Sequence, residues 1–325
     1  MGLSIGVAGV GRLGRVHVRV LSEMEGVDAV ACHDTQPDRA AAAAAEHGAR
    51  AFDDLGAMID AVDAVCVVVP TTHHAEVALE VFRRGKDVFV EKPLARSAEE
   101  SQQMVDGARE AGCILQVGHV ERFNGVIQAV APIVEDPSFI EVHRLAPFTV
   151  RGTDVSVVGD LMIHDLDLLS YLTGEWPVDI RAKGAAILTD GPDIVNARLE
   201  YPSGCVANVT ASRVTASPMR KIRIFSTSTG YISIDLLKGV ASHVRKAPSF
   251  DESIAALREK SDGHEQLGLA NFVEQEFIRS DGGEPLAKEL AAFCHTLTTR
   301  EAPQVTGEDG LNAVKLATEI LSQIS

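Results

Sequence analysis

The sequence predicts an α/β protein in which a doubly wound parallel sheet is followed by an α+β part with a large, mostly antiparallel sheet. Up to about residue 121, short apolar stretches alternate with amphipathic ones, a pattern typical of strand–helix–strand units. Beyond that point, strand-like stretches follow one another with few helices between them. A chain of 325 residues exceeds one typical core, so we expect two domains, 1–121 and 122–325, with the last helix packing back on the first domain.

The composition, with 46% hydrophobic and 23% charged residues, is that of an ordinary globular protein. A net charge of −16 argues against nucleic acid or an anionic membrane as a partner. No apolar run reaches the ~18 residues that span a bilayer, and the N-terminus lacks the basic start of a signal peptide. The five cysteines are far apart and form no C-x-x-C pair. We therefore expect reduced thiols, no metal site and a cytoplasmic location.

The first expected strand, residues 3–10, runs into a G-x-G-x-x-G sequence at 9–14 (GVGRLG), and a helical pattern follows. A lone glycine motif is weak evidence, but here it has the required strand before it and helix after it. The glycines allow a tight turn and the close approach of a pyrophosphate to the helix N-terminus. The motif therefore predicts a dinucleotide-binding, or Rossmann, domain.

A second strand, expected at 28–34, ends at Asp34, about 20 residues after the glycines. A carboxylate at this position accepts hydrogen bonds from both ribose hydroxyls and repels a 2′-phosphate. The sequence therefore favours NAD over NADP as the cofactor. Arg39 would soften that preference, but we expect it within the helix that starts at Pro37.

The alternation continues with further elements of the parallel sheet: strands at 63–69, 86–93 and 113–119, and helices at 75–85 and 97–112. Ligands of such sheets bind at the carboxyl ends of the strands, where residues 70–74, Lys92 and His119 fall. For His74 and His119, a loop histidine without a role is an equal alternative. Lys92 has less freedom, because it stands between a buried strand and a proline, and the Lys–Pro bond can be cis.

The second part of the chain reads as strands at 139–146, 179–187, 194–202, 205–214, 221–236 and 241–246, and two closing helices at 285–300 and 307–324. Residues 247–283 are polar, and we expect them to be irregular. A large antiparallel sheet with one free face often pairs with another subunit. We therefore expect a homodimer or homotetramer built through this sheet.

One more helix is expected at 157–172 (VVGDLMIHDLDLLSYL), an apolar segment that carries three aspartates and a histidine. Asp160, His164 and Asp167 are spaced at i, i+4 and i+7, so on a regular helix they share one stripe. The ordinary interpretation is the solvated face of an amphipathic helix. The alternative is a carboxylate that holds an imidazole ready for proton transfer.

Several motifs together resemble the Gfo/Idh/MocA oxidoreductases, over nearly the whole chain: GVGRLG at 9–14, Asp34, VPTTHH at 69–74, EKP at 91–93, VGHVERFN at 117–124 and DLMIHDLDLL at 160–169. The resemblance implies that the catalytic set is Lys92, Asp160 and His164. The residues expected to bind NAD are Gly9, Gly11, Arg12, Leu13, Gly14, Asp34, Pro70, Thr71, His74, Glu91 and Lys92.

Within the family, the stretches around 118–124, 154–169 and 217–236 look most like the branch that acts on UDP-N-acetylglucosamine-type sugar nucleotides. The resemblance implies oxidation of the sugar C3 hydroxyl to a ketone, which an aminotransferase then converts to an amine for lipid A. The expected substrate contacts are His119, Arg122, Asn124 and Arg151. Gly125 and Gly159 depart from the pattern without removing a functional group.

In the expected mechanism, His164 is the general base, Asp160 orients it, and Lys92 stabilises the developing alkoxide. The same set suits a free polyol such as inositol, so this second substrate class stays open. A third alternative is a non-catalytic NAD-binding regulator. It predicts loss of the catalytic lysine or histidine, and both are present.

Overall fold

The computed structural model describes residues 2–149, 155–260 and 272–324. The chain forms two compact units, and each is described by itself. Unit 1 comprises Met1–Phe123, Val158–Asp167 and Gly283–Ser322, and unit 2 comprises Asn124–Val157, Leu168–Gly282 and Gln323–Ser325. Unit 1 therefore takes in two segments that lie far along the chain from its first 123 residues.

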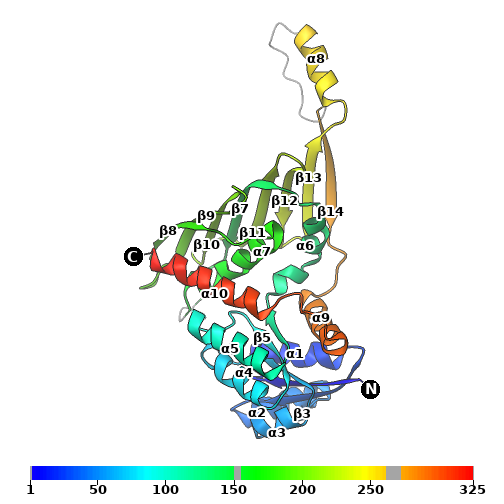
Figure 1. Cartoon of the computed structure of the whole chain (residues 1–325), viewed down its shortest axis with the longest axis vertical. Helices are drawn as coiled ribbons and strands as arrows, with labels where there is room; N and C mark the ends of the chain where they lie inside the picture. Colours follow the sequence, from blue (N-terminus) through cyan, green and yellow to red (C-terminus); the bar gives the residue numbers. More distant parts are fainter. Residues whose placement is uncertain (1, 150–154, 261–271, 325) are drawn as a thin grey trace. The chain divides into compact units, whose positions relative to one another are not determined.

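Unit 1 is built on a sheet in which, among the described residues, six parallel strands lie in the order β3-β2-β1-β4-β5-β6 (Figure 1). Their bounds are β1 (Leu3–Ala8), β2 (Val27–His33), β3 (Arg50–Ala51), β4 (Ala64–Val67), β5 (Asp87–Glu91) and β6 (Leu115–Gly118). Every residue of β4 and β6 is buried, as expected for strands covered on both faces. The predicted doubly wound parallel sheet is confirmed.

The α-helices of unit 1 are α1 (Arg12–Ser22), α2 (Pro37–His47), α3 (Leu55–Asp60), α4 (His74–Arg83), α5 (Ala98–Ala111), α9 (Pro285–Thr299) and α10 (Gly307–Ser322). Short turns at η1 (Thr71–His73) and η2 (Val120–Phe123) follow β4 and β6. The sequence did not predict β3 and α3, because two and six residues are too few to establish a hydrophobic period. The Asp54 side chain starts α3 by accepting a hydrogen bond from the Ala57 amide.

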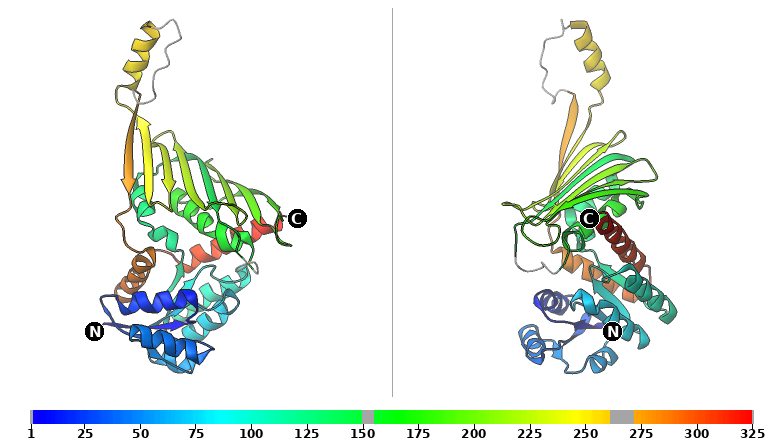
Figure 2. Two further views of the ribbon diagram at one scale, coloured as in Figure 1. Left: turned by 180° about the vertical axis from the view of Figure 1, so that it is seen from behind. Right: turned by 90° about the vertical axis from the view of Figure 1, so that its left-hand side faces the viewer.

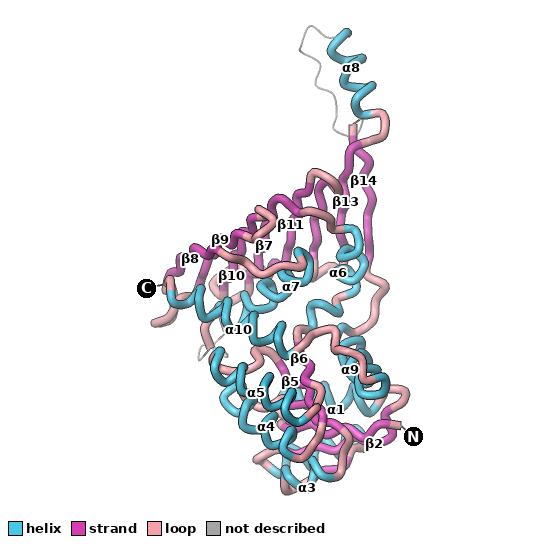
Figure 3. The backbone as a smooth tube through the Cα atoms, viewed as in Figure 1, coloured by secondary structure: helices cyan, strands magenta, loops and turns pink. Residues whose placement is uncertain are grey.

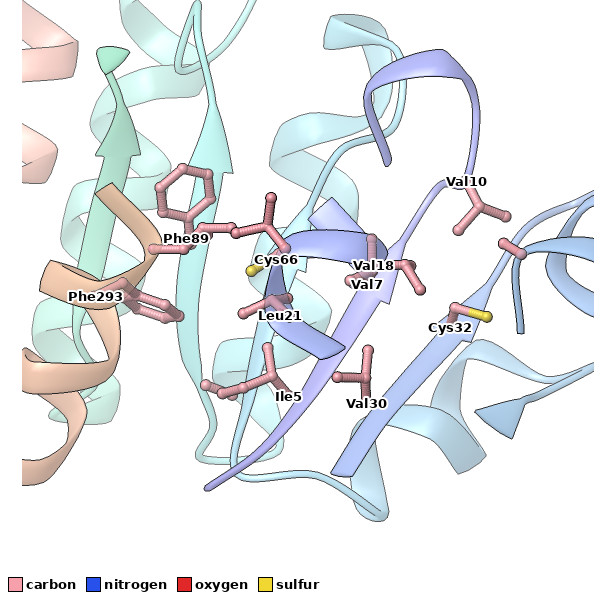
Figure 4. Close-up of a cluster of buried hydrophobic side chains, with 14 of the residues drawn as sticks. Ile5, Val7, Val10, Val18, Leu21, Val30, Cys32, Cys66, Phe89 and Phe293 are labelled. Atoms are coloured by element: carbon pink, nitrogen blue, oxygen red, sulfur yellow. The ribbon is translucent and has the colours of Figure 1, made fainter. Parts of the chain in front are cut away.

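The core of unit 1 joins the sheet to helices from both ends of the chain (Figure 4). Val18 and Leu21 of α1 and Phe293 of α9 belong to one buried cluster with Ile5 and Phe89 of the sheet. The Phe89 and Phe293 rings lie 5.7 Å apart between centroids. Fully burying an apolar side chain of this size stabilises the fold by about 1.5–3 kcal/mol, so α9 is an integral part of unit 1.

Unit 2 is built on a sheet in which, among the described residues, eight strands lie in the order β14-β13-β12-β11-β7-β10-β9-β8 (Figure 3). Among the described strands of this sheet, only the neighbours β7 and β10 run parallel to each other. The bounds are β7 (Pro137–Leu145), β8 (Asp179–Ala185), β9 (Ile194–Glu200), β10 (Val206–Ser212), β11 (Met219–Ser226), β12 (Gly230–Asp235), β13 (Val240–Lys246) and β14 (Val273–Arg279). The predicted large, mostly antiparallel sheet is confirmed.

One face of this sheet is apolar and buried, while the other is more open. In β12, Ile232 and Ile234 are buried, and the alternate residues Tyr231 and Ser233 are only half-buried. The helix α6 (Gly125–Val130) packs on β13 and β14, and a short turn, η3 (Ala131–Ile133), follows it. The opposite face carries an aromatic row of Phe139, Phe225 and Tyr231, with centroids 5.9 and 5.0 Å apart.

The expectation that residues 247–283 are irregular is wrong. They contain the helix α8 (Phe250–Lys260) and the edge strand β14, which pairs with β13 (Figure 2). The sequence did not predict β14, because most of its residues are exposed and polar. It therefore lacks the alternation of apolar and polar residues that is typical of a half-buried strand. Its pairing with β13 rests on backbone hydrogen bonds and on two polar side-chain contacts, Arg245 with Glu274 and Gln275 with Ser242. Among the helices that the structure describes, none is long and apolar enough to cross a membrane.

Candidate functional site

A cavity of about 840 Å³ opens in unit 1 at the carboxyl ends of β1, β2, β4 and β5. Ten of the eleven residues expected to bind NAD line it: Gly9, Gly11, Arg12, Leu13, Asp34, Pro70, Thr71, His74, Glu91 and Lys92. The sheet changes strand order at β1 and β4, so the cavity lies where open α/β sheets bind their ligands.

The three glycines of the motif are required for three different reasons. Gly9 has φ +89°, and Gly14 packs so tightly that a Cβ atom would stand 1.9 Å from the Gly9 carbonyl oxygen. Gly11 is different, because a Cβ there meets nothing in the protein within 4 Å and points to open space beside the start of α1. That helix has no acidic residue in its first turn and no side-chain cap. The unpaired backbone N–H groups at the N-terminus of α1 can therefore bind a pyrophosphate.

Asp34 forms the other end of the cavity from Glu91 and Lys92, since β2 and β5 lie on opposite sides of β1. It is 9% exposed, and its two oxygens accept hydrogen bonds from the Val10 and Gln36 amides, each at 2.9 Å. These bonds fix the carboxylate while leaving each oxygen able to accept another. The arrangement fits a ribose with two free hydroxyls, as NAD has.

Lys92 follows β5 directly, and the Lys92–Pro93 bond is cis, as the sequence allowed. Its Nζ donates a hydrogen bond to the Asp160 main-chain oxygen at 2.9 Å and lies 3.5 Å from Asp160 Oδ1. The structure therefore brings together an ammonium group and a carboxylate that are 68 residues apart.

The single stripe expected for Asp160, His164 and Asp167 does not form. Residues Val158–Met162 (η4) are π-helical, and the regular helix α7 (Ile163–Thr173) begins only after them. Asp160 and His164 are half-buried, whereas Asp167 is completely buried. The π-helical turn changes the angular spacing of side chains, so the i, i+4, i+7 rule for a regular helix fails here.

Asp167 binds Arg122 instead of joining Asp160 and His164. The Arg122 guanidinium donates two hydrogen bonds to Asp167, of 2.8 and 2.6 Å, and one of 3.2 Å to the Gln304 carbonyl. It also lies 3.3 Å from Asp309. Burial by itself would lower the pKa of Arg122, but the carboxylates of Asp167 and Asp309 outweigh burial and raise it. We expected Arg122 to bind a diphosphate, and this buried ion pair gives it a structural role instead.

The other expected substrate contacts are placed as follows. His119 is 1% exposed, and its Nδ1 lies 3.9 Å from Asp167 Oδ2. Burial lowers the pKa of His119, so the ring is neutral and inside the fold. Asn124 starts α6 in unit 2, where its Oδ1 accepts a hydrogen bond from the Val126 amide at 3.3 Å. Arg151 lies outside the described residues.

His74 lines the cavity, but its contacts are with the protein. Nδ1 lies 2.9 Å from the Pro93 carbonyl oxygen and Nε2 lies 3.0 Å from the Val69 carbonyl oxygen. Burial lowers the pKa of His74, so the neutral ring donates to one of the two carbonyls. The ring connects the loop after β4 to the loop that carries Lys92.

Sequence reasoning missed the buried polar residues behind Glu91. His17 of α1 is completely buried, and its Nε2 lies 2.8 Å from Glu91 Oε1. Gln116 of β6 and Glu289 of α9 are also completely buried. A histidine in an apolar helical stretch and a glutamate in a helix as apolar as α9 were the available signals.

Comparison with known proteins agrees with this geometry. Residues 3–119 match the family model described as "Oxidoreductase family, NAD-binding Rossmann fold", and residues 138–232 match the GFO/IDH/MocA C-terminal domain. The chain is 38% identical over 300 residues, 91% of its length and 92% of the relative's, to UDP-N-acetylglucosamine 3-dehydrogenase from Acidithiobacillus ferrooxidans.

Two further comparisons extend the match. A solved structure of the Acidithiobacillus ferrooxidans dehydrogenase superposes with a TM-score of 0.88, covering 100% of this chain and 98% of that one. Inositol 2-dehydrogenase from Rhizobium meliloti is 28% identical over 331 residues, 98% of this chain and 95% of the relative. The predicted cofactor, NAD, is confirmed by the family match.

The different roles of Gly11 and Gly14 lead to a prediction. Gly11→Ala meets no protein atom, so its free energy of unfolding should stay within about 1 kcal/mol of the wild type, while the Kd for NAD rises at least about tenfold. Gly14→Ala meets the Gly9 carbonyl and should lower the free energy of unfolding by about 1–3 kcal/mol. Chemical denaturation and cofactor titration measure both quantities. Wild-type NAD affinity in Gly11→Ala would contradict the assignment of the pyrophosphate site to the N-terminus of α1.

Proposed function

Because the chain belongs to the Gfo/Idh/MocA family of NAD-binding oxidoreductases, we propose that it oxidises the C3 hydroxyl of UDP-N-acetylglucosamine, or of a related UDP-sugar, to a ketone. The observation that carries the proposal is the similarity to UDP-N-acetylglucosamine 3-dehydrogenase, at 38% identity over nine-tenths of both chains. The relatives named inositol dehydrogenases are more distant at 28% identity or lower over comparable lengths.

The cofactor supplies the acceptor for the hydride of the alcohol carbon. We assign its pyrophosphate to the N-terminus of α1 and its adenosine ribose to Asp34. Glu91 and Lys92 stand at the opposite end of the same cavity, where the nicotinamide is expected. Gly14 does not line the cavity; its role is to let α1 pack against the Gly9 backbone.

The protein's own residues handle the hydroxyl proton in this proposal. His164 takes the proton, since an imidazole titrates near neutrality. Lys92 hydrogen-bonds the reacting oxygen and stabilises its developing negative charge. The contact between Lys92 and Asp160 supports these roles, because the main-chain oxygen and the carboxylate of Asp160 hold the ammonium group in place.

A UDP-sugar needs a cation for its diphosphate. We do not propose Arg122 as the cation that binds the diphosphate, because its side chain is buried against Asp167 and Asp309. Arg213 is also buried, and its Nη2 donates to the Val155 carbonyl at 2.7 Å. Arg151 remains the proposed contact, in the segment just before the one that carries Asp160 and His164.

We place the reaction in the cytoplasm, where its ketone product passes to an aminotransferase on the way to the amino sugars of lipid A. The five cysteines are free thiols, which suits a reducing compartment. The net charge of −16 supports a small-molecule substrate over nucleic acid.

The substrate proposal is tested by mixing the protein with NAD and UDP-N-acetylglucosamine, with an aminotransferase and an amino donor present to remove the ketone. NADH absorbance should grow, UDP should inhibit competitively, and Arg151→Ala should weaken that inhibition. Growth with myo-inositol but not with the UDP-sugar would assign the chain to polyols and leave the catalytic residues in place.

The catalytic assignment makes a second prediction. Lys92→Met and His164→Ala should each lower turnover roughly 10²–10⁴-fold. Lys315→Met, which replaces an exposed lysine of α10, should leave turnover unchanged. His164→Ala should still bind NAD with wild-type affinity, which shows that the loss is in the reaction. Near-native turnover of either active-site variant would refute the assignment.

We also propose a homo-oligomer formed through the open face of the sheet in unit 2. This face carries the aromatic row of Phe139, Phe225 and Tyr231. Contiguous aromatic surface on a sheet often marks an interface. Sedimentation equilibrium should show a dimer or tetramer, and Phe225→Asp should shift it toward the monomer. A wild-type monomer at all concentrations would rule out the interface.

A further inference from the structure

A cluster of buried polar side chains lies behind the nicotinamide end of the cofactor cavity. Its members are His17 on α1, Glu91 at the end of β5, Gln116 on β6 and Glu289 on α9, all within unit 1. Glu91 is 9% exposed, and the other three are 0% exposed. The proposed mechanism uses only Glu91, which lines the cavity. The others are buried polar groups that need an explanation.

The contacts of Glu289 are unusual for a buried carboxyl group. Its main-chain oxygen accepts a hydrogen bond from Gln116 Nε2 at 3.3 Å, but among the described residues neither carboxyl oxygen has a hydrogen-bond partner. Glu289 stands one helical turn before Phe293, which packs on Phe89 of β5 (Figure 4). Both side chains therefore belong to the face of α9 that covers the sheet.

The ionisable groups that face Glu289 are acidic. Glu91 and Asp167 both act on it, and Cys66 of β4 lies near Glu91 and Glu289. Burial first, and then the charges of Glu91 and Asp167, hold the pKa of Glu289 well above its usual range. Burial likewise raises the pKa of Cys66, which stays a neutral thiol. The charge of Asp167 is already balanced by Arg122.

Glu91 therefore connects two groups. On one side it forms the 2.8 Å contact with His17, and on the other it disfavours a second negative charge on Glu289. Two nearby carboxyl groups in a low-dielectric interior do not both ionise without a compensating positive charge. The nicotinamide ring carries such a charge in NAD⁺ and loses it in NADH.

We propose that Glu91, Glu289 and His17 form a proton site coupled to the cofactor, which releases a proton when NAD⁺ binds and takes one up when the bound NAD⁺ is reduced. The proton resides on Glu289 until the bound cofactor brings a further positive charge to the Glu91 end of the cavity. Proton release and uptake at this site depend on the charge of the bound cofactor and do not depend on which sugar is the substrate.

The proton balance closes over one turnover. Oxidation of an alcohol by NAD⁺ gives a ketone, NADH and one proton. With the cofactor bound throughout, one proton leaves the substrate hydroxyl and one enters the carboxyl pair, so no net proton appears in solution. The proton is released when NAD⁺ next replaces NADH.

The test counts protons on cofactor binding without any substrate. A pH indicator in weakly buffered solution should record up to about one proton released per NAD⁺ bound and close to none per NADH bound. The Kd for NAD⁺ should fall by up to about tenfold per pH unit as the pH rises, while the Kd for NADH stays flat. Glu289→Gln should abolish both the released proton and the pH dependence. Glu319→Gln, at an exposed position of α10, should change neither.

A second measurement needs no variant and covers the case in which Glu289→Gln does not fold. The infrared difference spectrum of the wild type should lose the C=O stretch of a protonated carboxyl when NAD⁺ binds, and regain it with NADH. The absence of this band in the difference spectrum would overturn the proposal. Equal proton release by NAD⁺ and NADH, or unchanged release in Glu289→Gln, would overturn it as well.

Discussion

The buried guanidinium of Arg122 holds together three segments of unit 1 that are distant in sequence. It binds Asp167 on α7, Asp309 on α10 and the Gln304 carbonyl before α10, while its own residue follows β6. Taking such ions out of water costs several kcal/mol each, so the pair stabilises the fold only because its geometry is bidentate and its donors are satisfied. The position of the segment that carries Asp160 and His164 depends on this interaction.

The ion pair with Arg122 gives Asp167 a different role from Asp160, although the two aspartates look equivalent in the sequence. Asp167 neutralises Arg122 inside the unit, whereas Asp160 stays half-buried beside Lys92. Asp160 lies in the π-helical turn Val158–Met162, where the angular spacing of side chains differs from that of the regular helix that carries Asp167. Extra turns of this kind recur at functional sites, and here the turn supplies the carbonyl that accepts the Lys92 hydrogen bond.

The sequence was most informative where local chemistry decides the structure. The glycine motif, Asp34 and the carboxyl ends of the strands predicted the cofactor cavity, because each requires only a strand, a turn and a helix in order. The sequence could not predict the burial of Arg122 and His119, because that burial depends on residues such as Asp167 and Asp309 that no local pattern connects to them. It gave no sign of β14, whose exposed polar residues lack the alternation of a half-buried strand. The interior cluster at Glu289 also required the tertiary fold, since its members come from four separate elements.

The assignment of residues 283–322 to unit 1 has a consequence for how the chain acquires its structure during synthesis. The strands β1 to β6 leave the ribosome long before α9, so the apolar surface that Phe293 and Leu290 cover stays without its partner while most of unit 2 is being made. The contacts that close this core are among the most non-local in the chain, and contacts of that kind form late and slowly. Unit 1 therefore cannot complete its fold during synthesis before unit 2 is made. Until α9 is added, the nascent chain exposes an apolar surface that is prone to aggregation and that chaperones can bind.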